Sequence, residues 1–266
     1  MPRTVLVFAA HPDDAEFFAG GTLAKLAREG ASVTLAIATD GRKGSFDYGS
    51  DELARVRSQD EAQRAAAALG ADPPILLGHS DLELDTLPPG QLREQFVRLI
   101  RQYRPDALFA HDPFARFETH PDHRAVAWAA SDAVTFAALP LMHPEHLEQG
   151  LEPHFVVEKY WFSDDASIFN RVIDTSATLD VKLAALAEHK SQMKFLVEDV
   201  LRQATLAGLD AASMLGEAVN DPMAALAWAM QAQAAQIGQR IGVQFGEAFR
   251  YTRFHQFVET LLETRG

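Results

Sequence analysis

Two short segments of the sequence hold side chains that could bind a metal ion and transfer protons. The first segment, AAHPDDAE, spans residues 9–16 and carries one imidazole and three carboxylates. The second segment, THPDHR, spans residues 119–124 and carries two imidazoles and one carboxylate. In both, a proline stiffens the backbone after a histidine, and the residue three positions after that histidine falls on the same side of a helical turn. Each segment therefore offers two candidate metal ligands on one side of a turn.

Together the two segments could complete a hydrolytic zinc site, which needs three nitrogen or oxygen ligands from the protein and an open position for water. His11, Asp14 and His123 would supply two imidazoles and one carboxylate. The sequence contains no cysteine, so a zinc site must use histidine and carboxylate ligands. We therefore expect Zn²⁺ as the cofactor, with another divalent metal such as Fe²⁺ or Mn²⁺ as the alternative.

Two neighbouring side chains could move a proton and stabilise charge. Asp13 is adjacent to an expected ligand but should point elsewhere, which suits a carboxylate that takes a proton from attacking water. His120 lies one turn from His123 and could steady the oxyanion of a carbonyl under attack. An isolated Asp-Asp pair usually only begins a helix, and an isolated His-x-x-His motif is weak evidence. The two segments together favour a metal site.

The elements around these segments alternate between strands and helices. Residues 3–9 form a continuous apolar run, which is typical of a strand buried on both faces of a parallel sheet. The pattern then predicts strands over 31–38, 75–77 and 107–110 and helices over 22–29, 51–69 and 89–103. This alternation indicates an α/β fold, a mostly parallel sheet with helices on both faces. In such sheets ligands bind at the carboxyl ends of the strands, where both segments lie.

The pattern changes after residue 140. A further strand is predicted over 155–162, and helix-forming residues dominate from about 178 to 240. We therefore expect a catalytic domain over residues 1–176 and a mainly helical C-terminal appendage over residues 177–266 that packs on the same domain.

The composition argues against two classes of partner. The chain has 24 Lys and Arg residues against 37 Asp and Glu residues, and its formal net charge of −13 does not suit binding to phosphates, so we expect no nucleic-acid partner. No apolar run approaches the roughly 20 residues that a membrane span needs, and the N-terminal apolar run is too short for a secretory signal. We expect a cytoplasmic protein with no membrane partner.

The segments and their surroundings resemble the PIG-L/LmbE-like family of zinc-dependent N-acetylglucosaminyl deacetylases, which includes deacetylases of mycothiol and bacillithiol synthesis. The resemblance rests on AHPDDAE, on GGTLAKLAREG over residues 20–30 and on HPDHRAV over residues 120–126. It covers about residues 3–139, and weaker similarity follows in HKSQM at 189–193 and GEAFR at 246–250. The family resemblance implies a Rossmann-like fold.

The resemblance also implies roles for individual residues. It assigns His11, Asp14 and His123 to the metal, Asp13 to general base catalysis, and His120 to transition-state stabilisation or general acid catalysis.

Two arginines are candidate substrate contacts. Many family members carry Arg-x-x-Glu on the helix after the second strand; aligning its Glu with Glu61 places Ser58 at the arginine position and Arg57 one residue early. Arg57 is therefore one candidate. Arg116, near the second His-Pro-Asp segment, is the other.

Several other polar side chains have no assigned role. We expect His143, His146 and His154 to be exposed imidazoles rather than a second metal site. His189, at a predicted helix end, could cap or pack as well as contact the catalytic site. Glu16 could reach the site or only complement a helix N-terminus.

The predicted function is hydrolysis of an N-acyl group, most simply an N-acetyl group, on an amino sugar or sugar conjugate, with zinc-bound water as the nucleophile. Two alternatives remain open. The same two histidines and one carboxylate would suit a non-haem Fe(II) oxygenase, and a non-catalytic sugar-binding family member would retain the site without turnover. The expected partners are a small N-acylated amino sugar and further copies of the chain in a homo-oligomer.

Overall fold

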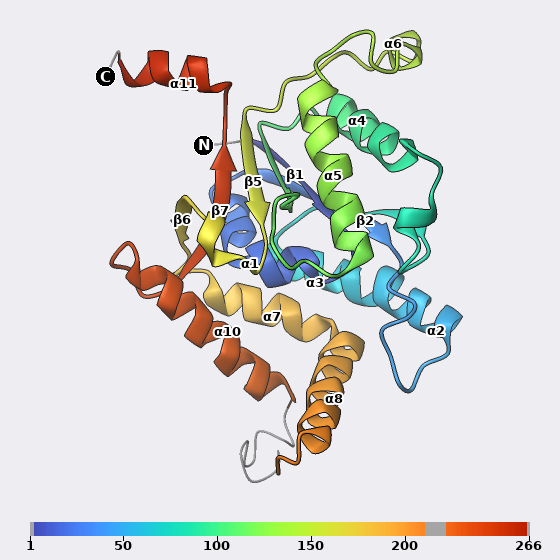
Figure 1. Ribbon diagram of the computed structural model, residues 1–266, viewed down its shortest axis with the longest axis vertical. Coiled ribbons are helices and arrows are strands. Elements are labelled where there is room, and N and C mark those ends of the chain that lie inside the picture. Colours follow the sequence, from blue (N-terminus) through green and yellow to red (C-terminus); the bar gives the residue numbers. More distant parts are fainter. Residues whose placement is uncertain (1–2, 211–221, 265–266) are drawn as a thin grey trace.

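A computed structural model describes residues 3–210 and 222–264 and shows a central sheet between two layers of helices (Figure 1). The sheet has the strand order β3-β2-β1-β4-β5-β7-β6. The strands are β1 (Thr4–Ala9), β2 (Ser32–Thr39), β3 (Ile75–His79), β4 (Ala107–His111), β5 (Glu158–Phe162), β6 (Arg171–Asp174) and β7 (Gly246–Thr252). The first five strands of this order are parallel to one another, and β7 runs antiparallel to both β5 and β6. The predicted mostly parallel α/β fold is confirmed.

Helices cover both faces of this sheet. The α-helices are α1 (Asp14–Arg28), α2 (Ser50–Arg55), α3 (Ala62–Leu69), α4 (Gln91–Tyr103), α5 (Pro121–Phe136), α6 (Glu145–Glu148), α7 (Leu179–Glu188), α8 (Lys190–Leu206), α10 (Pro222–Gln239) and α11 (Gln256–Glu263). A π-helix, η1 (Val56–Glu61), joins α2 to α3, and two short 3₁₀ turns are η2 (Leu84–Thr86) and η3 (Ala166–Ile168).

Alternation along β1 divides the core between the two faces. Leu6 and Phe8 pack with residues of α4 and α5. Val5 and Val7 point to the opposite face and pack with residues of α1, α3 and α7. All four side chains are fully buried, as the continuous apolar run predicts for a central parallel strand.

The site predicted from the sequence lies at the point where the order of strands in the sheet reverses, beside β1. After β1 the chain crosses to β2 on one side, and it later returns to place β4 on the other side of β1. The loops after β1 and β4 therefore diverge and leave a crevice at the carboxyl ends of these strands, where ligands bind in open α/β sheets.

The C-terminal part differs from the prediction in one respect: it is not only helical. Residues 246–250, expected in that part, begin β7, which pairs with β5 and β6 and so extends the main sheet. The predicted strand over 155–162 begins only at Glu158. Part of the predicted helical stretch, residues 211–221, lies outside the described residues. The division at residue 176 stays a prediction.

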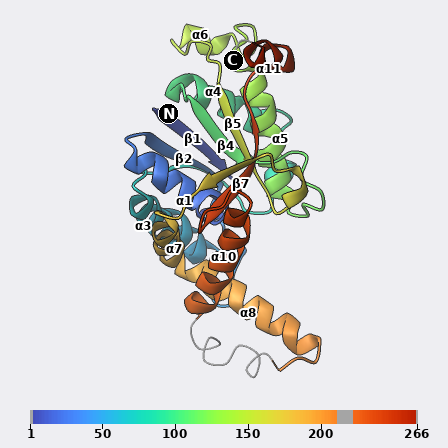
Figure 2. The same cartoon turned by 90° about the vertical axis from the view of Figure 1, so that its left-hand side faces the viewer.

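Helices α8 and α10 form an extension at one end of the molecule (Figure 2). α10 packs on β7 and on α8, so the extension is joined to the sheet. Among the described residues, every helix is too short or too polar to cross a bilayer.

Candidate metal centre

The loop between β1 and α1 is organised by the carboxylate of Asp14. One carboxylate oxygen, Oδ2, accepts hydrogen bonds from the backbone N–H groups of Ala10 and His11, both at 2.8 Å. Asp14 is also the first residue of α1, where a carboxylate is favoured by the helix dipole. The chain therefore turns sharply after β1, and the side chains of His11 and Asp14 are held on the same side of the turn.

The three predicted metal ligands meet at this turn. His11 Nδ1 lies 3.2 Å from His123 Nε2, which lies 3.4 Å from Asp14 Oδ1. The remaining pair, His11 Nδ1 and Asp14 Oδ2, is separated by 3.6 Å. Zinc bonds of about 2.0–2.1 Å at tetrahedral angles place ligand atoms about 3.3 Å apart. The structure thus contains a His/Asp/His site in which each histidine faces a different oxygen of the Asp14 carboxylate, at separations close to those of ligand atoms around one zinc ion.

The outer nitrogens of both imidazoles face carboxylates. His123 Nδ1 lies 3.0 Å from Glu118 Oε2, and His11 Nε2 lies 3.2 Å from Asp81 Oδ1 and 3.3 Å from Asp122 Oδ2. Such carboxylate–histidine pairs fix the ring orientation and make the inner nitrogen a better metal ligand. Asp122 also accepts hydrogen bonds from two backbone N–H groups of the loop after β3, at positions 82 and 84.

The protonation of the metal-free site reflects this concentration of charge. Burial would raise the pKa of Asp14, but the imidazoles of His123, His111 and His11 hold that pKa well below its usual range. Burial alone would lower the pKa of His123, but the carboxylates of Asp14 and Glu118 outweigh it and raise the pKa to about 9. An ionised carboxylate is therefore ready to bind a cation, whereas His123 must lose a proton first.

His120 differs from His11 and His123, whose pKa values are raised, because it is held neutral. It is the N-cap of α5, and its Nδ1 accepts a hydrogen bond from the backbone N–H of Asp122 at 3.3 Å. Burial lowers its pKa to about 4. A neutral ring that accepts through Nδ1 carries its proton on Nε2, so His120 offers an N–H donor at neutral pH. Its ring centroid lies 4.5 Å from that of His11.

Asp13 lies beside the metal centre and is bound by Arg57. The Asp13 Oδ1 atom accepts a hydrogen bond from the Arg57 guanidinium at 2.9 Å, and both side chains are buried. The same guanidinium donates to the carbonyl of Gly41 at 3.0 Å. Arg57 thus connects the base predicted on the first loop with the loop after β2.

The π-helix η1 sets the position of Arg57 relative to Glu61. A π-helical turn holds more residues than an α-helical turn. Glu61, at the end of η1, is fixed because its carboxylate accepts from the backbone N–H and the hydroxyl of Ser191, at 2.9 and 2.6 Å. In this wider turn Arg57 faces Asp13, and the hydroxyl of Ser58 instead donates to the carbonyl of Ala54.

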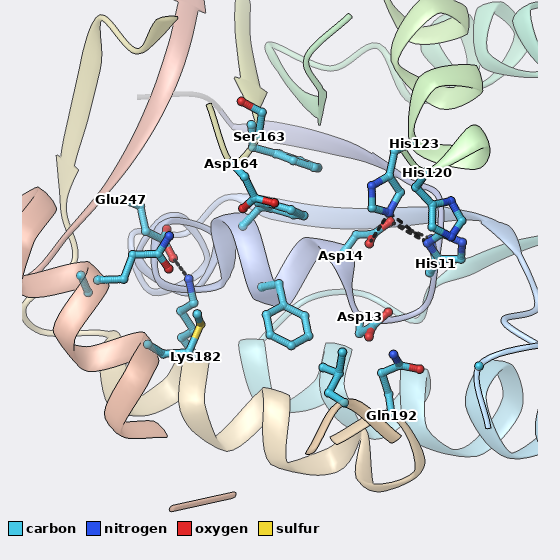
Figure 3. A pocket seen from close by; sticks show the side chains of 18 of the residues that line it. His11, Asp13, Asp14, His120, His123, Ser163, Asp164, Lys182, Gln192 and Glu247 are labelled. Carbon is cyan, nitrogen blue, oxygen red and sulfur yellow. Dashed lines mark hydrogen bonds and ion pairs between the residues drawn. The ribbon is translucent and has the colours of Figure 1, made fainter. Parts of the chain in front are cut away.

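A cavity of about 530 Å³ extends from the metal centre (Figure 3). His11, His120 and His123 lie at one end of it, and the buried ion pair between Lys182 and Glu247 lies at the other. The walls between these ends are largely apolar: they include Phe17 and Phe18 of α1, Phe162 and Phe169, Phe195 and Leu196 of α8, and Met230 and Ile237 of α10.

The two candidate substrate contacts lie in different surroundings. Arg57 lines the cavity, although its guanidinium is engaged by Asp13 and Gly41. Arg116 lines a separate surface depression; its side chain is 61% exposed and pairs with Asp165 at 3.0 Å. Contact of either arginine with substrate stays a prediction.

Glu16 and His189 are brought together behind the site. Both are buried, and His189 Nε2 lies 3.6 Å from Glu16 Oε1. Burial would lower the pKa of His189, but Glu16 raises it. Glu16 therefore points away from the metal ligands and into the contact between α1 and the α7–α8 junction.

Sequence reasoning missed four residues of this centre. His111, the last residue of β4, is buried with its Nε2 3.0 Å from Asp14 Oδ2. Asp81, Glu118 and Asp122 hold the histidines from outside. His111 ends β4, Asp81 follows β3, Glu118 lies just before the second His-Pro-Asp segment and Asp122 belongs to it. Their positions at the carboxyl edge of the sheet were the available signal.

Comparison with known proteins identifies the family. The family model for GlcNAc-PI de-N-acetylase, PIG-L, matches residues 6–134. Diacetylchitobiose deacetylase from Thermococcus kodakarensis is 34% identical over 193 residues, which cover 71% of this chain and 70% of that protein. The chain belongs to the PIG-L family.

Other relatives agree with this assignment. A 1D-myo-inositol 2-acetamido-2-deoxy-alpha-D-glucopyranoside deacetylase from Thermobispora bispora is 29% identical, covering 70% of this chain and 67% of that protein. The crystal structure of N,N'-diacetylchitobiose deacetylase from Pyrococcus horikoshii with its inhibitor has a TM-score of 0.77 and 28% identity, covering 95% of this chain and 84% of that one. The predicted family, fold and deacetylase class are therefore confirmed, and the oxygenase alternative finds no support among these relatives.

The fold by itself does not decide the reaction. A 4-carboxy-2-hydroxymuconate hydratase from Pseudomonas putida has a TM-score of 0.68 at 16% identity, covering 95% of this chain and 97% of that chain. The function must be argued from the metal centre and its cavity.

Proposed function

We propose that the protein is a zinc-dependent hydrolase that removes an N-acyl group, in the simplest case N-acetyl, from a small amino sugar or sugar conjugate. The observation that carries the proposal is the spacing of His11 Nδ1, His123 Nε2 and the Asp14 carboxylate, at 3.2 to 3.6 Å, next to the carboxylate of Asp13 in the same cavity. Three ligands leave a tetrahedral ion one position for water. The named relatives, which are deacetylases of N-acetylated sugars, support the same reaction.

The proposed ligands are His11, Asp14 and His123. When bound, zinc would polarise the amide carbonyl and lower the pKa of water toward about 7. Two His and one carboxylate also suit Fe²⁺ or Mn²⁺. Zinc is proposed because two histidines, one carboxylate and an open position for water form a common hydrolytic zinc site.

Asp13 takes the proton of the attacking water in this proposal. Its carboxylate lies beside the ligands, and the hydrogen bond from Arg57 at 2.9 Å holds it in one orientation. A fixed carboxylate that does not bind the metal can accept a proton from water and later return it to the leaving amine. Arg57 then acts as a positioning residue through Asp13.

His120 stabilises the oxyanion. Its pKa of about 4 keeps the ring neutral, and its Nδ1 is occupied by the backbone N–H of Asp122. The remaining Nε2–H is a fixed donor next to the metal ligands, and one such donor contributes about 3–4 kcal/mol to transition-state stabilisation in other enzymes. Donation of this proton to the leaving amine is the second role that the position permits.

The cavity does not specify which amine carries the acyl group. The volume of the cavity, about 530 Å³, falls in the range of sites that bind small molecules, about 300–1,000 Å³. The substrate is therefore proposed only as a small N-acylated amino sugar or its conjugate. Assembly into a homo-oligomer and a cytoplasmic location stay predictions.

The test is a screen for released amine. Metal-free protein is reconstituted with Zn²⁺, Fe²⁺ or Mn²⁺ and incubated with N-acetylated monosaccharides, disaccharides and thiol-sugar conjugates, with and without oxygen. We expect stoichiometric acetate and free amine, independent of oxygen, and loss of activity in His123→Ala. Oxygen-dependent turnover would favour the oxygenase, and tight sugar binding without turnover by any metal form would favour a non-catalytic protein.

A further inference from the structure

A second group of histidines lies in the connection between α5 and β5. His143, Glu145 and His146 each offer one ligand atom, and these atoms lie within 4.8 Å of one another. We propose that they form a second metal site, suited to Zn²⁺ or another divalent ion that binds imidazole. The site lies beyond the C-terminal end of α5, whereas His123 lies at its N-terminal end (Figure 1). At 1.5 Å per residue, α5 separates the two centres by about 24 Å.

The spacing of the two rings is that of a metal-binding pair. The ring centroids of His143 and His146 are 5.2 Å apart, and those of His11 and His123 in the first centre are 5.1 Å apart. Two imidazoles bound to one tetrahedral ion by bonds of about 2.0–2.1 Å have centroids about 5 Å apart. The second pair therefore has a similar centroid separation, with its ring planes 21° apart against 59° in the first pair.

Each of these rings has one nitrogen left for a ligand. His143 Nε2 and His146 Nδ1 are buried, and neither has a hydrogen-bond partner within the described part of the chain. The His146 side chain is completely buried. Buried polar atoms without partners are uncommon and require an explanation. A metal ion would bind these two nitrogens.

The other nitrogen of each ring faces a carboxylate, as in the first centre. His146 Nε2 lies 2.8 Å from Glu94 Oε1, and His143 Nδ1 lies 3.1 Å from Glu145 Oε1. This arrangement matches that of His123 with Glu118 and is the usual support of a metal-binding histidine. Glu145 is half exposed, which leaves an approach from solvent for the ion and for water molecules that would complete its coordination.

The backbone around this site is fixed by Arg101. Its buried guanidinium donates to the carbonyls of Ala137, Leu139, Met142 and His143. His143 has φ 56°, a left-handed conformation that is costly for a residue other than glycine. The connection is thus held in a strained shape that presents His143 toward His146. We infer a structural role for the ion: it fixes the connection that leads from α5 into β5.

The sequence prediction for this loop needs correction. His146 is buried rather than exposed, and the His143 side chain is only 22% exposed, because the loop folds back onto α4 and Arg101. His154 does not belong to this group, because its Nε2 donates a hydrogen bond to the carbonyl of Pro105 at 2.8 Å. It therefore serves as a matched control in the same connection.

The test counts metal ions in the full-length protein. Wild type, His143→Gln, His154→Gln and His123→Ala are dialysed against buffered free Zn²⁺ and analysed for zinc per chain by elemental mass spectrometry. We expect two zinc ions in wild type and in His154→Gln, and one in His143→Gln and in His123→Ala. Visible spectra of the Co²⁺ form of His123→Ala should show a bound ion, and adding His143→Gln should abolish it.

These measurements do not depend on the substrate or on the proposed reaction. One zinc ion per chain in wild type at saturating free Zn²⁺ would overturn the second site, as would two ions retained in His143→Gln. Circular dichroism of each variant checks that it is folded, and His143 is chosen over the fully buried His146 because its replacement leaves no large internal gap.

Discussion

At the level of single residues, the proposed mechanism assigns metal binding and proton transfer to two adjacent carboxylates, Asp14 and Asp13. Asp14 receives two backbone N–H groups and faces three imidazoles, so it is fixed as an anionic ligand. Its neighbour Asp13 points to Arg57 instead. Adjacent residues at the start of a helix point about 100° apart, which is why two consecutive carboxylates can serve a metal and a base.

If Asp13 is the base, replacing it should lower activity without removing the metal ion. Asp13→Asn keeps the shape and one hydrogen bond acceptor for Arg57 but cannot accept a proton from water at neutral pH. We expect zinc content to stay at the wild-type level while kcat falls about 10²–10⁴-fold. Elemental analysis and steady-state kinetics on the substrate found in the screen check this. Full activity in Asp13→Asn would exclude Asp13 as the base.

The protonation of His123 predicts the pH dependence of metal binding. With a pKa raised to about 9, the ring is protonated in the metal-free site at pH 7, and zinc must displace that proton. The neighbouring carboxylates also raise the pKa of His11 well above its usual range, so both rings can release a proton when zinc binds. Apparent zinc affinity should therefore rise about 10–100-fold per pH unit between pH 7 and pH 9 and fall as the pH is lowered. Calorimetry in buffers with different ionisation enthalpies measures the released proton. An affinity that is constant over this range would contradict the prediction.

At the level of elements, the π-helix η1 determines what its arginine does. A regular helix through residues 56–61 would rotate Arg57 relative to Glu61, which is fixed on α8 by Ser191. The wider π turn lets Glu61 hold α8 while Arg57 reaches both Asp13 and Gly41. Irregular turns of this kind are often retained where they position functional side chains.

Because Arg57 contacts both Asp13 and Gly41, a variant can distinguish whether it positions Asp13 or contacts the substrate. Lysine keeps the positive charge but lacks the planar fork whose two nitrogens hold Asp13 and Gly41 in a fixed geometry. In Arg57→Lys we expect kcat to fall about 10–100-fold with KM and zinc content nearly unchanged, because a displaced base slows the reaction. Arg55→Lys, on the same helix with an exposed side chain, is the matched control and should behave as wild type. A rise in KM alone would instead make Arg57 a substrate contact.

At the level of the whole molecule, the cavity depends on chain segments more than 200 residues apart. The first loop and α1 supply two of the proposed metal ligands, His11 and Asp14, and two phenylalanines, and α8, α10 and β7 supply the opposite wall. Glu247 of β7 connects these parts, since its carboxylate accepts from the backbone N–H groups of Gly21 and Thr22 and from Lys182 Nζ, at 2.7 to 2.9 Å. The C-terminal part is therefore required to enclose the site.

The buried pair predicts a large effect on stability. Lys182→Met leaves the carboxylate of Glu247 buried beside an apolar group, which should lower the free energy of unfolding by about 3–5 kcal/mol. Lys182→Met combined with Glu247→Gln should recover part of that loss. Lys194→Met, which removes an exposed ion pair with Asp47, should leave the free energy of unfolding nearly unchanged, because solvent screens that pair. Urea unfolding measures all three, and equal losses in the two single variants would contradict the argument.

The sequence by itself determined the fold class and most of the metal centre. Apolar runs depend on neighbouring residues, so β1, the second half of α1 and the two His-Pro-Asp segments were readable locally. The helix was predicted from residue 22, whereas α1 begins at Asp14. The parallel topology placed both segments at one edge of the sheet. His11, Asp14 and His123 could therefore be paired from residue type and position.

Only the tertiary structure decided what surrounds these ligands. The contacts of His111, Asp81 and Arg57 with the centre join residues between 44 and 97 positions apart, and no local pattern encodes such contacts. The insertion of β7 between β5 and β6 and the burial of His146 have the same origin. Each depends on how distant segments pack, since burial and long-range pairing are set by the complete fold.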